Sequence, residues 1–241
     1  MSLHRLRLES CTKTGEGRYL LDQAQARHLT KVLRCYTGAL VEGLCQEGSV
    51  LLRIQVTPYG VEALEVSSSP GVDYLRRVDL LVGFLKADQW DQVLRVACEL
   101  GVARIWPVLC ERSVPRPDDW GRKKERYERI LFESTRQCGA LRAPELMDLK
   151  PLDVLDLSEL PEVRLGAFLS PDSVPLVSAL PEGDLAIAVG PEGDWTAREV
   201  EILKGAGFKA VSLGPRVLRA STAVAAALGA ARILHPEVCS L

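Results

Sequence analysis

Residues 186–223 read AIAVGPEGDWTAREVEILKGAGFKAVSLGPRVLRASTA, which predicts a strand, a turn, a helix, a second strand and a loop entering another helix. Gly190 and Gly193 lie in the turn after the first strand, and glycine allows close backbone approaches that a Cβ atom would block. Thr196 and Glu199 have the spacing of a capping box, so we expect the helix to begin near Ala197. Because open α/β sheets bind ligands at the carboxyl ends of their strands, this turn is a candidate binding loop. The alternative is a plain capped turn.

The second loop follows the strand AVSLG and carries two arginines. Gly214 turns the chain, and Ser221 or Thr222 is expected to cap the alanine-rich helix that comes next. Such a helix can simply be part of the core, since small side chains allow close packing. Arg216 and Arg219, however, precede this helix at the end of a strand. Charged side chains are unfavourable in a hydrophobic core, so a purely structural role does not account for them.

Neither loop matches a common nucleotide-binding motif. No Lys-Ser/Thr pair follows the first turn, as a P-loop requires, and GAGFKA at 205–210 follows a helix instead of a strand. The motifs therefore disfavour ATP and NAD as ligands.

The two parts of the chain differ in hydrophobic pattern. Residues 1–71 show short alternating apolar runs, which predict a small β-barrel with one helix, and SSSPG at 67–71 is the best linker candidate. Residues 72–241 show apolar strands without alternation, separated by helices, which are typical of a parallel sheet covered on both faces. We therefore expect an α/β domain after a β-rich one.

Composition narrows the functional classes. The chain is 47% hydrophobic and 26% charged with a net charge of −2, yet residues 1–36 and 122–142 each carry seven Lys/Arg against three Asp/Glu. These local basic stretches either contact a nucleic acid or lie on solvated helix faces. Seven cysteines without a CxxC pair and three distant histidines predict reduced thiols of a cytoplasmic protein, with neither a disulfide framework nor a metal site. No apolar segment indicates a signal peptide or membrane span.

Four stretches together resemble the RsmE family of the SPOUT superfamily of RNA methyltransferases. They are the C-terminal GPEG…VSLGPRVLR..TA pattern, LLVGFLKADQWDQVLRVACELGVARIWPVLCERSV at 80–114, RYERILFESTRQCGALRAPEL at 126–146 and LLDQAQARHLTKVLR at 20–34. The resemblance implies a PUA-like RNA-binding barrel over 1–71 and a SPOUT methyltransferase domain over 72–241 whose C-terminal segment forms a trefoil knot. It also implies a homodimer without metal or membrane, and S-adenosylmethionine as cofactor. The implied reaction is methylation of N3 of a uridine in 16S (small-subunit) rRNA, at the position conventionally numbered 1498.

Carried onto this sequence, the resemblance assigns three sets of site residues. Arg219 is the candidate for stabilising the developing charge on the base, or else contacts the cofactor carboxylate or a phosphate, and Glu192 or a water accepts the proton. The expected cofactor residues are Leu169, Ser170, Val189, Gly190, Pro191, Gly193, Ser212, Leu213, Gly214, Val217, Leu218 and Thr222. The expected RNA contacts are Arg5, Arg7, His28, Lys31, Arg34, Arg122, Lys123 and Arg142, reaching free rRNA or the assembled small subunit.

Three positions depart from the family pattern. Asp194 stands where the family usually has the last glycine of GPEGG, Ser221 replaces a glutamate, and Ala140 replaces an arginine whose charge Arg142 is positioned to restore in part. These departures leave open an RNA-binding module without cofactor or a catalytically inactive paralogue. A conventional Rossmann methyltransferase fits less well, because GFLKADQW at 83–90 occupies the place of its glycine-rich loop.

Overall fold

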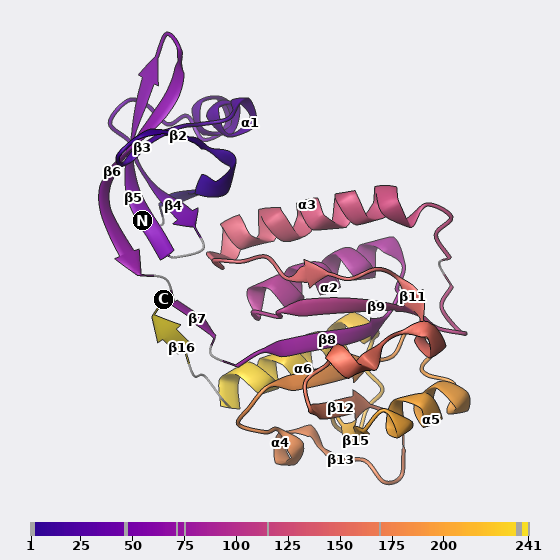
Figure 1. The fold of residues 1–241 in the computed structure, drawn as a ribbon. Helices are drawn as coiled ribbons and strands as arrows, with labels where there is room; N and C mark the ends of the chain where they lie inside the picture. The colour runs from indigo at the N-terminus through magenta and orange to yellow at the C-terminus, as the bar shows by residue number, and fades with distance from the viewer. Residues whose placement is uncertain are drawn as a thin grey trace. The chain divides into compact units, whose positions relative to one another are not determined.

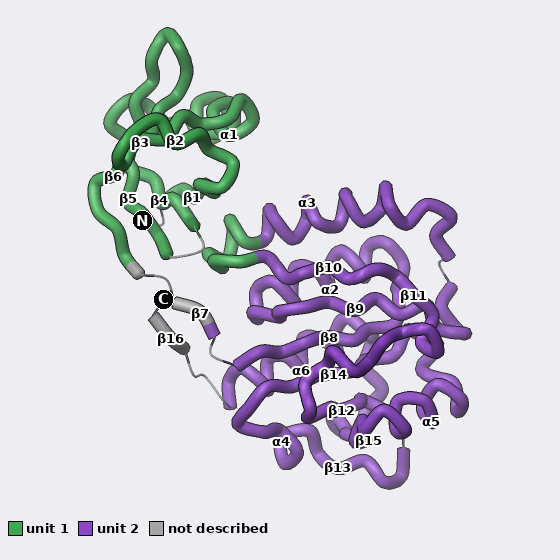
Figure 2. Tube along the Cα trace, viewed as in Figure 1, with its two compact units in different colours: residues 1–73, 135–142, 239–241 green, residues 74–134, 143–238 purple. Residues whose placement is uncertain are grey.

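The computed structural model describes residues 3–45, 48–70, 72–74, 76–114, 116–168, 170–234 and 238–240. These residues divide into two compact units, which are described separately (Figures 1 and 2). Unit 1 comprises residues 1–73, 135–142 and 239–241, and unit 2 comprises residues 74–134 and 143–238. The segment 135–142 thus groups with residues far from it in the sequence.

Unit 1 is built on a six-stranded sheet in the order β1-β4-β5-β6-β3-β2, antiparallel except for the β1–β4 pair. Its core includes Leu6, Leu29 and Leu52. The predicted helix is present as a short α-helix that continues into a π-helical turn. The elements are β1 (His4–Arg7), β2 (Thr12–Gly15), β3 (Arg18–Leu20), α1 (Gln23–Arg27), the π-turn (His28–Val32), β4 (Leu40–Cys45), β5 (Gly48–Thr57) and β6 (Gly60–Pro70).

The expected linker at 67–71 is wrong for its first four residues. Ser67, Ser68, Ser69 and Pro70 belong to β6 and pair with the first residues of β5, with Ser69 opposite Ser49. Serine and proline are poor strand formers in isolation, but pairing with a neighbouring strand overrides that preference. The remaining residue, Gly71, lies outside the described residues.

Unit 2 contains an eight-stranded sheet in which every neighbouring pair is parallel, as the apolar runs predicted. The order is β10-β9-β8-β14-β12-β15-β13, with β11 also beside β9. Its strands are β8 (Val78–Gly83), β9 (Arg104–Leu109), β10 (Glu145–Leu146), β11 (Lys150–Pro151), β12 (Val163–Ala167), β13 (Val174–Pro175), β14 (Leu185–Val189) and β15 (Phe208–Ser212). Its helices are α2 (Ala87–Glu99), α3 (Trp120–Cys138, the last four residues of which group with unit 1), α4 (Leu176–Ala179), α5 (Ala197–Gly205) and α6 (Ala220–Leu234). A separate two-stranded sheet pairs β7 (Val72–Tyr74) with β16 (Val238–Ser240).

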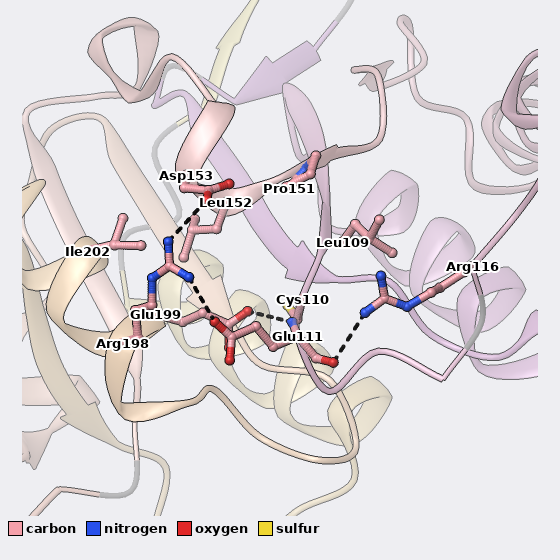
Figure 3. A pocket seen from close by; sticks show the side chains of 10 residues that line it. All are labelled: Leu109, Cys110, Glu111, Arg116, Pro151, Leu152, Asp153, Arg198, Glu199 and Ile202. Carbon is pink, nitrogen blue, oxygen red and sulfur yellow. Dashed lines mark hydrogen bonds and ion pairs between the residues drawn. The ribbon is translucent and has the colours of Figure 1, made fainter.

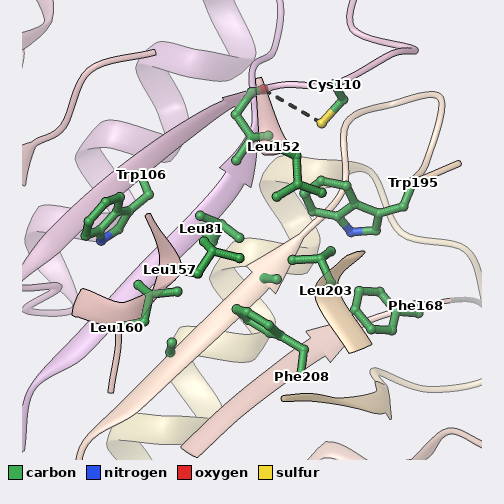
Figure 4. Close-up of a cluster of buried hydrophobic side chains, with 13 residues drawn as sticks. Leu81, Trp106, Cys110, Leu152, Leu157, Leu160, Phe168, Trp195, Leu203 and Phe208 are labelled. Carbon is green, nitrogen blue, oxygen red and sulfur yellow. Dashed lines mark hydrogen bonds between the residues drawn. The ribbon is translucent and has the colours of Figure 1, made fainter. Parts of the chain in front are cut away.

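Hydrophobic side chains cover both faces of this sheet. All five residues of β14 are buried, and successive side chains of a strand point to opposite faces. On one face, Ala186 and Ala188 belong to a cluster that includes Trp195 and Leu203 from the α5 region (Figure 4). α6 contacts both β14 and α2. Burial on both faces explains why these strands lack the alternation seen in unit 1.

The chain order and the spatial order of three strands differ, and this difference positions the site. β12 lies between β14 and β15, with Arg164 opposite both Ala186 and Phe208. The chain therefore runs from β12 to one neighbour and then crosses to the other. Such a switch in strand order opens a crevice at the carboxyl ends of the strands, where ligands bind in α/β sheets.

The sequence predicted where the two helices next to this crevice begin, and one prediction is confirmed while the other is wrong. The capping box is confirmed, because the Thr196 side chain accepts from the Glu199 N–H and α5 begins at Ala197. The expectation that Ser221 or Thr222 caps α6 is wrong, since α6 begins at Ala220 and both residues lie inside its first turn. The Ala223 N–H donates to the Arg219 carbonyl at 2.8 Å, so the strong helix former Ala220 extends the helix toward its N-terminus.

Candidate functional site

A cavity of about 320 Å³ lies at the carboxyl ends of β12, β14 and β15. Its volume falls within the roughly 300–1,000 Å³ of small-molecule sites. Apolar side chains and glycine backbone dominate its wall, and a few charged side chains stand among them. The lining residues are Ala167, Phe168, Val189, Gly190, Pro191, Glu192, Asp194, Val211, Ser212, Leu213, Gly214, Arg216, Val217, Leu218, Arg219, Ala220 and Ala223.

Close backbone packing shapes the GPEG wall of the cavity. A Cβ atom on Gly190 would lie 3.0 Å from Asp194 Oδ1 and 3.1 Å from the Trp195 ring. A Cβ atom on Gly83, at the end of β8, would lie 2.6 Å from the Pro191 nitrogen. Asp194 adopts a left-handed backbone with φ of 58°, and its Oδ1 accepts from the Trp195 N–H at 2.8 Å. The turn is therefore held in one shape by contacts on both of its sides.

The second wall is the loop from Ser212 to Arg219. Gly214 has φ of 121°, and its N–H donates to the Ser212 hydroxyl at 3.2 Å. Arg216 and Arg219 are exposed, and neither side chain has a hydrogen-bond or ion-pair partner among the described residues. Their positive charges are therefore free to meet an anionic group in the cavity.

Glu192 carries negative charge to the same cavity. Its Oε1 accepts from Gln89 Nε2 of α2 at 2.5 Å, which orients the carboxyl group although the residue is exposed. Sequence reasoning did not select Gln89, because it lies on a helix distant in the chain from the GPEG turn. The cavity thus has arginine side chains on one loop and a positioned carboxyl group on another.

Most of the expected cofactor residues line this cavity. Val189, Gly190, Pro191, Ser212, Leu213, Gly214, Val217 and Leu218 do so, together with both candidate catalytic residues, Arg219 and Glu192. Ser170, Gly193 and Thr222 do not line it; the carbonyl of Gly193 instead accepts from Arg112 Nη1 at 2.9 Å. Leu169 lies outside the described residues.

Sequence reasoning missed Phe168, which packs directly over Gly166. A Cβ atom on that glycine would clash with the Phe168 ring at 2.1 Å. The Gly-Ala-Phe spacing at the end of β12 is the signal that could have identified this wall of the cavity. Further lining residues not predicted are Ala167, Val211, Ala220 and Ala223.

The expected RNA contacts lie in three different settings. Arg5 pairs with Glu42 at 2.7 Å and donates to the Gln137 carbonyl, while the nearly buried Arg7 donates to the carbonyls of Ala140 and Leu141, all within unit 1. His28 is half-buried and lines a hollow of about 380 Å³ in unit 1. The exposed members are Lys31, Arg34 and Arg142 in unit 1, and Arg122 and Lys123 in unit 2.

A second, smaller recess of unit 2 has a different character. It measures about 160 Å³, and its charged groups bind one another (Figure 3). Arg198 lies 3.6 Å from Glu111 and 3.4 Å from Asp153, while the buried Glu199 carboxylate accepts from the Glu111 N–H at 2.8 Å. Burial, and then the Glu199 charge, raise the pKa of Cys110, so this thiol stays protonated. The recess has the features of a structural contact.

In the part of the chain that the structure describes, no group of three or more His, Cys, Asp or Glu side chains could hold a metal ion. Within the same ranges, no helix is long and apolar enough to cross a membrane.

Comparison with known proteins gives consistent matches. Residues 73–232 match the family described as RNA methyltransferase domain. The chain is 29% identical to ribosomal RNA small subunit methyltransferase E of Synechocystis over 88% of this chain and 72% of the relative, and 35% identical to the Aquifex aeolicus protein of the same name over 56% and 58%. The crystal structure of a Neisseria gonorrhoeae ribosomal RNA small subunit methyltransferase E bound to S-adenosyl methionine superposes with a TM-score of 0.84 at 26% identity, covering 96% of this chain and 98% of that one.

Proposed function

The chain belongs to the RNA methyltransferase family that its residues 73–232 match, and from this we propose that it methylates small-subunit ribosomal RNA with S-adenosylmethionine. The finer proposal is that the product is N3-methyluridine at the position conventionally numbered 1498 in 16S rRNA. The observation that carries the proposal is the strand-end cavity, because it combines a preformed glycine wall with unpaired arginines.

The residues present fit S-adenosylmethionine. Gly190 is buried and leaves no room for a side chain, so its backbone forms the wall itself. The mostly apolar lining suits an adenine ring and a thioether-like chain, while the charge of Arg216 suits the carboxylate of an amino acid. Leu213, Val217 and Leu218 are the apolar residues that we expect against the adenosine, with Val189 and Pro191 on the opposite loop.

The architecture also supports the remaining structural proposals. α6 follows β15 in the chain, yet it contacts β14 and α2 on the other side of β12, so the chain crosses back past β12 after β15. This crossing favours the trefoil knot over 72–241. The mixed six-stranded sheet of unit 1 favours a PUA-like RNA-binding barrel over 1–71. We further propose a homodimer that acts in the cytoplasm, where ribosomal RNA is processed.

When bound, S-adenosylmethionine supplies a methyl group on a positively charged sulfur. Uridine N3 carries a proton, so the base must become anionic before or during methyl transfer. The free charge of Arg219 on the cavity wall would stabilise the developing oxyanion of the ring. Lowering the pKa of N3 by two to three units requires about 3–4 kcal/mol, which one preorganised cation can provide.

The proton requires an acceptor near the same wall. Glu192 is oriented by Gln89 and lines the cavity, so we propose it as the acceptor, with a water as the alternative. A uridine within folded RNA must be unstacked to reach this cavity. Holding the ring in line with the methyl group then contributes through proximity and orientation.

Nucleoside mass spectrometry tests the proposal. Small-subunit rRNA from cells with and without the protein is digested, and N3-methyluridine is expected only where the protein is present. Free rRNA and assembled small subunits are then compared as substrates for the purified protein. No difference in N3-methyluridine would remove the uridine assignment, and no heat of binding with S-adenosylmethionine would remove the methyltransferase assignment.

An inactive RNA-binding paralogue is the second candidate, because Ser221 and Ala140 replace charged family residues. Ser221 is 5% exposed within the first turn of α6 and does not line the cavity. The position is therefore not at the cavity wall in this chain, which favours the enzyme. The paralogue would bind RNA in a salt-dependent way and show no binding of S-adenosylmethionine.

A further inference from the structure

A groove of about 640 Å³ runs between α3 and the segment that follows β8, entirely within unit 2. Exposed cations line it, namely Lys86 before α2 and Arg122, Lys123, Arg126 and Arg129 on α3. Glu125 is the acidic residue of the lining. We call this cavity the basic groove.

Most of these positive charges are not neutralised by an ion pair within the chain. Arg126 binds Asp91 through both of its terminal nitrogens, at 2.9 and 2.5 Å. Arg122 lies 4.0 Å from Asp119 with both side chains largely exposed, a geometry that contributes little. Among the described residues, the side chains of Lys86, Lys123 and Arg129 show no hydrogen bond or ion pair.

On α3, Arg122 and Arg126 are four residues apart, and Arg126 and Arg129 are three apart, so these cations lie on one face of the helix. Glu125 lies three residues from Arg122 and four from Arg129, and it offsets part of this charge. The lining therefore keeps an excess of positive charge.

Packed aromatic rings form the floor of the groove. Phe84 packs edge-on against Trp120 with ring centroids 5.7 Å apart and against Tyr127 at 6.3 Å. Phe84 and Tyr127 are 2% and 4% exposed, so they offer almost no ring face on which a base could stack. The groove is therefore suited to the sugar–phosphate backbone instead of the bases.

The basic groove adjoins the strand-end cavity. Gly83 directly precedes Phe84 on the groove floor and touches Pro191 on the cavity wall. Gln89, three residues after Lys86, donates to Glu192 of the cavity. A strand lying in the groove would thus pass beside the point where a nucleotide enters the cavity.

From these observations we infer that the basic groove binds the phosphate backbone of the RNA strand next to the nucleotide to be methylated. The inference rests on the proposed function, and it adds a path for the substrate through Lys86, Lys123 and Arg129. Binding there is independent of sequence, because charge supplies the contact and the buried rings supply no readout of bases.

The test compares two variants with the same loss of charge. Lys123→Gln/Arg129→Gln removes two groove cations, whereas Lys204→Gln/Lys209→Gln removes two exposed cations of α5 and β15 that line neither cavity. Binding of a labelled single-stranded RNA is measured by fluorescence anisotropy between 50 and 200 mM salt. KM for rRNA, kcat and the affinity for S-adenosylmethionine are measured in parallel, and circular dichroism verifies folding.

For the groove variant, the slope of log affinity against log salt should fall by about 1.4, since each lost phosphate contact on a single strand accounts for about 0.7. A slope difference of about 1.4 corresponds to an affinity loss on the order of 25-fold for each tenfold change in salt, here at 0.1 M relative to 1 M. KM for rRNA should rise while kcat and cofactor affinity stay near wild type, and the control should match wild type. A wild-type slope and KM in the groove variant, or equal losses in both variants, would overturn the inference.

Failure of the proposed function is a separate result. If the wild type binds RNA with the expected salt dependence through the groove but transfers no methyl group, the groove stands and the methyltransferase proposal falls. If the wild type methylates rRNA and the groove variant is unaffected, the proposed function stands and the groove inference falls.

Discussion

The strand-end cavity and the smaller recess beside Cys110, both in unit 2, contain similar residue types, but their charged side chains have different partners. In the strand-end cavity, the side chains of Arg216 and Arg219 have no partner among the described residues, and they line the cavity together with Gly190 and Gly214. In the recess beside Cys110, Arg198 lies between two carboxylates and Glu199 is bound by backbone N–H groups (Figure 3). Charges satisfied within the chain stabilise the fold, whereas unsatisfied charges in a preformed cavity are free to act on a ligand.

Arg219→Ala tests the strand-end cavity and should have the largest effect. We expect kcat for rRNA methylation to fall by about 100- to 1000-fold, since one preorganised charge opposite the developing anion is lost. The affinity for S-adenosylmethionine, measured by calorimetry, should stay within a few-fold of wild type. If cofactor binding disappears together with activity, Arg219 contacts the cofactor carboxylate instead.

Glu199→Ala tests the recess beside Cys110. It should lower the free energy of unfolding instead of kcat. Its 3% exposed carboxylate accepts from the N–H groups of Glu111 and Thr196, both at 2.8 Å. Leaving buried donors unpaired costs about 1–3 kcal/mol, measurable as the free energy of unfolding in urea. The matched control is Glu201→Ala at an exposed position of the same helix, which should change stability by less than about 0.5 kcal/mol. Equal losses in the two variants would contradict this role.

Arg198→Ala should have the smallest effect. The side chain is 69% exposed and its ion pairs measure 3.4 and 3.6 Å, so we expect a loss of less than about 1 kcal/mol. The loss should vanish in 1 M salt, where the screening length is about 3 Å. Thermal unfolding at low and high salt measures this, and a large fall in kcat would show that the recess belongs to the active site after all.

The sequence predicted the elements that depend on local patterns. The apolar runs of β14 and β15 and the capping box of α5 were all recognised because each signal lies within a few residues. The start of α6 was placed too late, because alanine at 220 extends a helix past the serine and threonine that normally cap one.

Features that depend on distant segments were not predictable. The grouping of residues 135–142 with unit 1 depends on Arg5 and Arg7, more than a hundred residues earlier, which donate to carbonyls of that segment. Likewise, the GPEG turn was identified from its glycines, but its contact with Gly83 and its hydrogen bond from α2 require the fold. Single-sequence patterns carry no information about which loops meet.

The left-handed backbone of Asp194 explains how this chain can lack the last glycine of the family pattern. Aspartate is among the few non-glycine residues that tolerate a φ near 58°, and its side chain closes a local hydrogen bond to the next N–H. Aspartate at this position therefore adopts a left-handed backbone that is also open to glycine. A motif search that insists on glycine at this position would overlook this chain, whereas one that admits glycine, asparagine or aspartate would retrieve it.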